Sequence, residues 1–199
     1  STHRGTLFPY TTLFRSIIFG LLSFVSYLVE GAVGDWSALY LFEDKGIVIQ
    51  EAVMGVMLFN GTMCIGRLLG NTIGKHVTSK QVVVGGYLLG AIAMALIVFL
   101  PGHASMYTYL LLGISLAMVV PNLFSAMGEQ NVIPMTQAVA TSTMLGYMGI
   151  LMGPALIGFI AHGTSLTVAF IVLTALLVVS AGTGKYAYML MEKSKEAEA

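Results

Sequence analysis

Six long apolar runs dominate the sequence, and each is long enough to cross a lipid bilayer. Runs of about 18 or more residues with few charges are typical of transmembrane helices. Backbone groups in lipid need internal partners, and the alternating pattern of membrane β-barrels is absent, so helices are expected. We predict an all-α membrane protein whose spans cover residues 17–42, 52–73, 82–100, 106–127, 136–161 and 166–183.

The composition supports a membrane location and argues against several other classes of protein. Charged residues make up 9% of the chain, compared with about 25% in soluble domains. The formal net charge is zero and the basic residues are scattered, so no nucleic-acid partner is expected. The single cysteine, Cys64, lies in an apolar run, and no metal-ligand spacing occurs. We therefore predict membrane lipid as a partner and no cofactor or metal.

The first sixteen residues differ in character from the rest of the chain. Residues 6–16, TLFPYTTLFRS, resemble the conceptual translation of a sequencing adapter. The chain has no initiator methionine, and this polar stretch directly precedes a membrane span. We therefore expect residues 1–16 to be a non-native leader, 17–190 to form the helix bundle, and 191–199 to form a charged cytoplasmic tail. On this interpretation the chain is an N-terminally truncated fragment.

Basic residues in the loops predict the orientation, because cytoplasmic loops carry an excess of lysine and arginine. One side of the predicted bundle carries only Lys45. The opposite side carries five lysines: Lys75, Lys80, Lys185, Lys193 and Lys195. We predict a multi-pass protein of the inner or plasma membrane with a cytoplasmic C-terminus.

The spans also differ in polarity. The third and sixth spans are almost wholly apolar and are expected to face lipid. Polar or small residues form one stripe of the first span: Ser23, Ser26, Tyr27, Glu30, Gly34 and Ser37. The fifth span has a small-residue face, typical of close helix packing in membranes, at Ala138, Ser142, Gly146, Gly149 and Gly153. This order of polarity suggests two repeats of three helices.

Three segments carry a resemblance to a known family. Residues 146–161, GYMGILMGPALIGFIA, resemble the eleventh helix of major facilitator superfamily (MFS) transporters, especially sugar-permease-like members. Residues 66–75 are similar to the family's cytoplasmic loop, with Asn71 where an aspartate is usual, and residues 30–41 look like its seventh helix. The resemblance covers residues 17 to 190. It implies the C-terminal six-helix half of such a transporter, with a missing N-terminal half as its partner.

Glu30 is the sharpest candidate for function. It lies ~20 Å along the first predicted helix, inside the hydrocarbon layer. A carboxylate there must face a cavity, pair or be protonated. Glu30 therefore either couples transport to protons or binds substrate, or it is a structural carboxylate paired to another helix. Asp35, ~27 Å along the same helix, either caps or gates the pathway or is a solvated surface group.

The remaining candidates each leave two interpretations open. Trp36 either belongs to an interfacial aromatic belt or stacks on a sugar ring. Asn60 and Asn122 bind substrate or a neighbouring helix. Arg67 gates the pathway or anchors a loop, or its side chain merely extends to the interface. Prolines remove helix hydrogen bonds, so Pro121 and Pro154 are expected to kink their spans. Gating or structural roles are also expected for Asn71, Gly149, Gly153 and Gly158.

The resemblance and the membrane pattern together predict a secondary active transporter of a small organic solute. The predicted mechanism is alternating access with a sugar or related metabolite as substrate. In one form of this hypothesis, a proton gradient drives the transport. A drug or metabolite efflux permease, and a non-transporting membrane component, are the alternatives. An enzyme is not expected, because the sequence shows no nucleophile–base pair, metal cluster or phosphate-binding loop.

Overall fold

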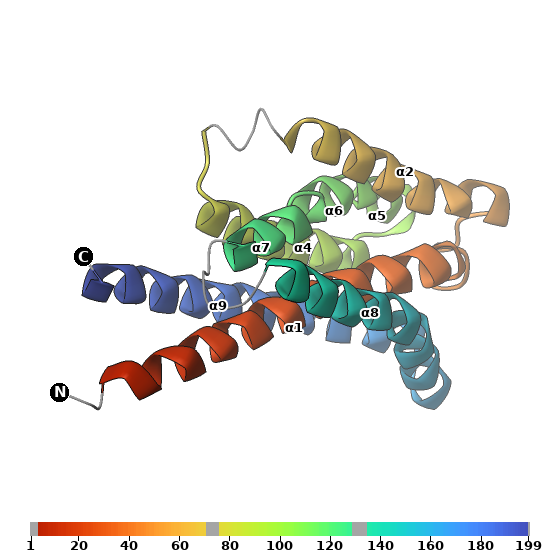
Figure 1. Ribbon diagram of the computed structural model, residues 1–199. Coiled ribbons are helices and arrows are strands. Elements are labelled where there is room, and N and C mark those ends of the chain that lie inside the picture. Colours follow the sequence, from red (N-terminus) through yellow and green to blue (C-terminus); the bar gives the residue numbers. More distant parts are fainter. Residues whose placement is uncertain (1–3, 71–75, 129–134, 199) are drawn as a thin grey trace.

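The structure is a computed structural model that describes residues 4–70, 76–128 and 135–198. All regular elements in this part of the chain are helices, and Figure 1 shows them running roughly along one common direction. The helices are α1 (Arg4–Glu43), α2 (Ile49–Leu68), α4 (Ser79–Phe99), α5 (Gly102–Tyr107), α6 (Tyr109–Leu116), α7 (Val119–Gly128), α8 (Met135–Gly163) and α9 (Leu166–Glu198).

Six stretches of these helices are long and apolar enough to cross a membrane, which confirms the predicted all-α, six-span architecture. They are Ile17–Glu43, Ile49–Leu68, Ser79–Phe99, Gly102–Gly128, Thr143–Gly163 and Leu166–Lys193. The first and last helices extend beyond the predicted spans, because α1 continues through residues 4–16 and α9 continues through the expected tail to Glu198. The predicted end of the second span, residue 73, lies outside the described residues.

The fourth span is not one helix; the sequence analysis expected a kink at Pro121 but not a division into three helices. It is divided into α5, α6 and α7, and α7 begins at Val119, two residues before Pro121. Proline has no N–H to donate to the Ala117 carbonyl. The next carbonyl, that of Met118, accepts two bonds from Asn122, from its backbone nitrogen at 3.2 Å and its side-chain nitrogen at 2.8 Å. Pro154, by contrast, lies inside an unbroken α8.

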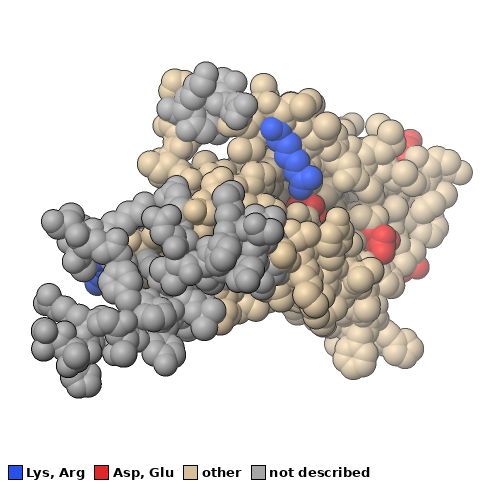
Figure 2. All heavy atoms as spheres, viewed as in Figure 1, with Lys and Arg blue, Asp and Glu red and all other residues tan. Residues whose placement is uncertain are grey.

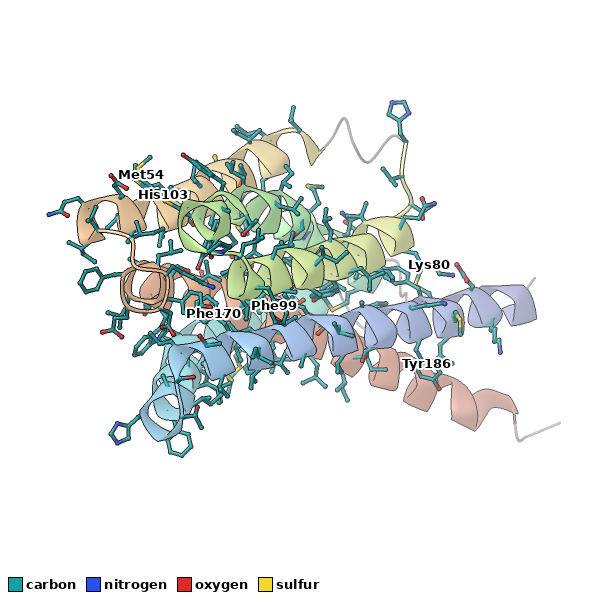
Figure 3. All side chains as sticks on the ribbon, turned by 180° about the vertical axis from the view of Figure 1, so that it is seen from behind. Met54, Lys80, Phe99, His103, Phe170 and Tyr186 are labelled. Atoms are coloured by element: carbon teal, nitrogen blue, oxygen red, sulfur yellow. The ribbon has the colours of Figure 1, made fainter. Side chains whose placement is uncertain are left out.

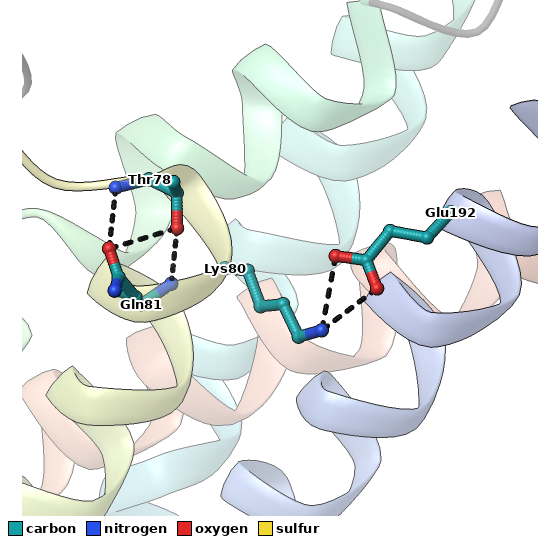
Figure 4. Close-up of polar contacts among 4 residues, drawn as sticks. All are labelled: Thr78, Lys80, Gln81 and Glu192. Atoms are coloured by element: carbon teal, nitrogen blue, oxygen red, sulfur yellow. Dashed lines mark hydrogen bonds and ion pairs between the residues drawn. The ribbon is translucent and has the colours of Figure 1, made fainter.

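The helices are arranged with α4 and α9 on one side of the bundle. Figure 1 shows α2, α7 and α8 in front of them, and Figure 3, turned by 180°, shows α4 and α9 nearest the viewer. An ion pair between Lys80 Nζ and Glu192 Oε2 (2.9 Å) joins the two helices near the chain termini, and Gln81 completes a capping box with Thr78 (Figure 4). We define the open face as the side of the bundle that carries α2, α7 and α8.

Helices α1 and α8 approach each other closely through glycines on both sides. A Cβ atom built at Gly31 would lie 2.6 Å from the Ile150 carbonyl oxygen. Cβ atoms at Gly149 and Gly153 would fall against the backbone of Phe24 and Leu28. The prediction that the small-residue face of the fifth span packs against another helix is therefore confirmed for its glycines. The side chains of Ala138 and Ser142 lie outside the described residues.

The predicted polar stripe of the first span lies along one unbroken helix, but its residues contact different neighbouring helices. The buried Ser26 hydroxyl lies 2.8 Å from the Tyr87 hydroxyl of α4, and Tyr87 donates to the Leu22 carbonyl at 2.7 Å. Tyr27, the next residue along, packs its ring against Gly146 of α8. Residues of one stripe separate in this way because α1 is central and contacts helices on several sides.

Lys45 ties three helices at the far end, by which we mean the end opposite the termini. Its Nζ donates to the Val98 carbonyl in the last turn of α4 at 2.6 Å, and lies 5.3 Å from the centroid of the Tyr40 ring. That ring stacks on Phe170 of α9 at 4.3 Å. Partial burial lowers the pKa of the Lys45 amine, and the neighbouring Asp44 carboxylate acts in the opposite direction.

Candidate functional site

An ion pair between Glu30 and Arg67 lies in the middle of the membrane span. Glu30 is at the midpoint of the span Ile17–Glu43. Arg67 Nη2 lies 3.2 Å from Oε1 and 3.3 Å from Oε2 of Glu30. Figure 2 shows basic and acidic atoms touching near the centre of the open face, on a surface that otherwise carries few charges. The pair joins α1 to α2.

The position of Arg67 in the sequence explains how it reaches this depth. Arg67 is next to the last residue of α2, Leu68, so its side chain extends from the end of a helix rather than from its middle. A long side chain can carry its charge away from its own backbone position. A carboxylate at mid-membrane needs such a partner, because an unpaired charge in a low dielectric costs several kcal/mol. Of the interpretations left open for Glu30, pairing to another helix is therefore present in this structure.

Two tyrosines complete the site. Tyr27 lies one helical turn before Glu30 on α1, and its ring packs against Gly146, the residue before Tyr147 on α8. Tyr147 projects from α8 and is 66% exposed. The site therefore combines α1, α2 and α8. Sequence analysis did not single out Tyr147, because nothing in its spacing distinguishes it from other tyrosines of the apolar spans.

Three other candidates lie elsewhere or make local contacts. Asp35 and Asn60 are exposed, and neither has a hydrogen-bond partner among the described residues. The Asn122 side chain donates within its own span, to the Met118 carbonyl, and this bond reaches no neighbouring helix. Asn71 lies outside the described residues. The structure thus brings together Tyr27, Glu30 and Arg67, but not the asparagines.

Trp36 joins α1 to α8 near the far end. Its Nε1 donates to the Pro154 carbonyl at 2.9 Å, and its ring lies 2.9 Å from a Cβ atom built at Gly158. Three predicted residues therefore form a single helix–helix contact. Trp36 also lines an open cavity of about 590 Å³, together with Leu39, Glu43, Asp44, Gly158, Ala161, His162, Ser165 and Leu166. Across the described residues, no group of three or more His, Cys, Asp or Glu side chains could hold a metal ion.

Comparison with known proteins identifies several relatives. The chain is 39% identical over 184 residues, 92% of its length, to an uncharacterised MFS-type transporter of Yersinia pestis, and covers 48% of that protein. It is 30% identical over 84% of its length to the membrane protein MosC of Rhizobium meliloti, covering 41% of it. It is 27% identical over 75% of its length to the fosmidomycin resistance protein of Escherichia coli, covering 37% of it.

These relatives are longer than the chain, which spans about half of the Yersinia protein and less of the others. No protein-family model and no solved structure matches it. The relatives are named as transporters, membrane proteins or resistance proteins, not as enzymes. With six apolar spans and homology to MFS-type transporters, the chain matches a six-helix half of a transporter of the major facilitator superfamily.

Proposed function

We propose that this chain is the C-terminal half of a secondary active transporter that moves a small organic solute by alternating access. The observation that carries the proposal is the Glu30–Arg67 pair at mid-span on the open face. Ionisable groups inside membrane spans are costly and usually mark substrate, ion or proton pathways. A preceding six-helix half, of the length by which the relatives exceed this chain, would cover the open face and supply the opposite wall of the pathway.

Proton coupling through Glu30 forms part of the proposal. Arg67 neutralises the Glu30 carboxylate in the state described here. When α2 shifts against α1 during the transport cycle and Arg67 moves away, a carboxylate in apolar surroundings is stabilised by taking up a proton. Glu30 would then carry one proton per cycle. A sugar or related polar metabolite is the first substrate class to test, on the resemblance of residues 146–161 to sugar-permease-like members.

Flux measurements on the full-length transporter in proteoliposomes test this function. We expect uptake of at least one candidate sugar or metabolite to rise when an inward proton gradient is imposed. Glu30→Gln should abolish gradient-driven uptake while leaving expression unchanged. The matched control is Glu51→Gln, which alters an exposed carboxylate at the far end that bonds only His103 in the described structure. Gradient-driven uptake that is equal in Glu30→Gln and wild type would show that Glu30 is structural.

A drug-efflux function is the second candidate, because one relative is named a fosmidomycin resistance protein. The same proteoliposomes distinguish the two directions if a panel of antibiotics, fosmidomycin among them, is loaded inside. Drug export with no sugar uptake would favour efflux. No flux of any solute under any gradient would refute transport altogether and favour a non-transporting membrane component.

The proposed orientation places the chain termini in the cytoplasm of the inner or plasma membrane. Lys80, Lys185 and Lys193 lie on helices near the ends that carry the termini, whereas Lys45 lies at the far end. Excess positive charge marks the cytoplasmic side. A protease-accessible tag after residue 199 should be cut from inside-out vesicles and protected in right-side-out vesicles. The opposite pattern would reverse the orientation.

A further inference from the structure

Arg67 contacts Glu30 through only part of its guanidinium group. Both hydrogen bonds to the carboxylate come from Nη2. The guanidinium has five N–H donors, and those of Nη1 and Nε have no partner within the part of the chain that the structure describes. Arginine usually grips a carboxylate with two nitrogens in a parallel fork. One edge of Arg67 is therefore available for a second acceptor.

The unused edge belongs to the more accessible member of the pair. The Arg67 side chain is 45% exposed, compared with 14% for the Glu30 side chain. A solute entering from the open face would therefore meet the cation before the carboxylate. Asp35, the next acidic residue along α1, follows Glu30 by more than one turn and lies ~140° around the helix from it. Asp35 therefore lies on a different side of α1 from Glu30, and it places no second carboxylate next to Arg67.

Groups on α1 and α8 on the open face could hold the remainder of a small molecule whose anionic group is bound by Arg67. The ring of Tyr27 lies one turn before Glu30 and packs against Gly146 of α8, and Tyr147 is the next residue of α8. Tyrosine hydroxyls both donate and accept hydrogen bonds. Met144 and Leu151, three before and four after Tyr147 and so on the same side of α8, are 68% and 76% exposed and supply apolar surface beside Tyr147. A cation, two hydroxyls and an apolar border are the elements of a site for a small amphipathic anion.

We propose that the solute carried by this transporter is a small organic anion, and that Arg67 binds its carboxylate or similar group through the Nη1–Nε edge. This proposal rests on the proposed transport function and narrows it to a substrate class. Glu30 then acts as the resident competitor, holding Arg67 in place when no solute is present. When the solute binds, Arg67 either holds both carboxylates at once or releases Glu30 and holds the solute alone.

The proposal predicts opposite effects of neutralising the two partners. Arg67→Gln removes the cation and should weaken anion binding at least about tenfold, because hydrogen bonds to charged groups are among the stronger ones in proteins. Glu30→Gln removes the competing carboxylate and should tighten anion binding several-fold. An ion pair that only joins α1 to α2 would show neither effect. The double variant Glu30→Gln/Arg67→Gln, which leaves no unpaired charge, controls for misfolding.

Binding is measured on the purified full-length transporter in detergent by the ligand-dependent rise in its unfolding temperature. The probes are two matched pairs, gluconate with glucose and benzoate with benzyl alcohol, which differ chiefly in the carboxylate. We expect at least one anion to stabilise the wild type more than its neutral partner does. Stabilisation by that anion should increase in Glu30→Gln and disappear in Arg67→Gln and in the double variant.

Three results would overturn the proposal: no stabilisation by either anion, equal stabilisation of wild type and Arg67→Gln, or equal stabilisation by the two members of a pair. The failure of this proposal is distinguishable from failure of transport. If proteoliposomes carry a neutral sugar and the carboxylate probes do not bind, the substrate class is wrong and the transport function stands. If no solute is carried, the proposed function itself fails.

Discussion

A substitution of alanine for Gly31 tests the close contact between α1 and α8. The Gly31 Cβ would lie 2.6 Å from the Ile150 carbonyl oxygen and 3.1 Å from the Ile150 Cα. Both atoms belong to the α8 backbone, which cannot rotate away as a side chain can, so α1 and α8 must separate. Gly34, three residues later on the same helix, has nothing within 4 Å of a built Cβ. Gly34→Ala is therefore a matched control for Gly31→Ala.

The magnitude follows from two opposing contributions. Replacing a helical glycine with alanine favours the helix by about 0.5 to 1 kcal/mol, and this gain is common to both variants. Overpacking a close contact costs about 1 to 3 kcal/mol, and only Gly31→Ala carries this cost. The free energies of unfolding of the two variants should therefore differ by about 1 to 3 kcal/mol. This corresponds to about a 5-fold to 140-fold difference in the unfolding equilibrium constant.

The assay is unfolding of the full-length protein by SDS in mixed detergent micelles, followed by circular dichroism. Gly34→Ala should unfold at the wild-type SDS fraction or above it, and Gly31→Ala below it. Equal midpoints for the two variants would refute the assignment of a backbone-to-backbone contact between α1 and α8. A shift that is larger for Gly34→Ala would show that α1 is rotated relative to its position here.

The same unfolding assay checks three further contacts. Trp36→Phe keeps an aromatic ring but makes it smaller and removes the bond to the Pro154 carbonyl (2.9 Å), so it should lower the free energy of unfolding by at least about 0.5 to 1.5 kcal/mol; no change would contradict a stabilising role for this bond. Lys45→Met loses the bond to the Val98 carbonyl (2.6 Å) and the cation above an aromatic ring, and should cost about 1 kcal/mol; an increase in stability would contradict a stabilising role for the charge. Lys80→Met removes a surface ion pair of 2.9 Å and should cost less than about 1 kcal/mol; a larger loss would indicate a wider network.

The candidate site shows how far residue type alone can lead. Glu30 was identifiable because a carboxylate in a long apolar run has few ways to be stabilised. Its partner could not be identified in the same way, because Arg67 is distant from Glu30 in the sequence. A gating residue, a loop anchor and a side chain extending to the membrane interface were all compatible with an arginine near the end of its span. Tyr147 was missed for a similar reason. Which of several tyrosines reaches the site depends on how α8 is rotated against α1.

The contacts that cross between helices also lay beyond the sequence. Pro154 and Trp36 each had a plausible separate role, but the structure joins them in one hydrogen bond. Asn122 was expected to bind substrate or a neighbouring helix and instead bonds the Met118 carbonyl. This carbonyl already accepts the Asn122 backbone N–H, so the side chain adds a second bond to the same acceptor. The kink at Pro121 was predictable from one residue, whereas the acceptor that satisfies Asn122 was not.

The sequence by itself determined that the chain is a membrane protein of six helical spans, because apolar length and the need to satisfy backbone hydrogen bonds in lipid leave few alternatives. It also singled out Glu30, because a charged side chain in lipid costs free energy unless it is paired, protonated or facing a cavity. Tertiary structure alone decided that the stripe of the first span divides among α2, α4 and α8, and that Glu30 meets Arg67. The physical reason is that hydropathy depends on each residue separately, whereas the rotation and separation of packed helices depend on side chains from several spans at once.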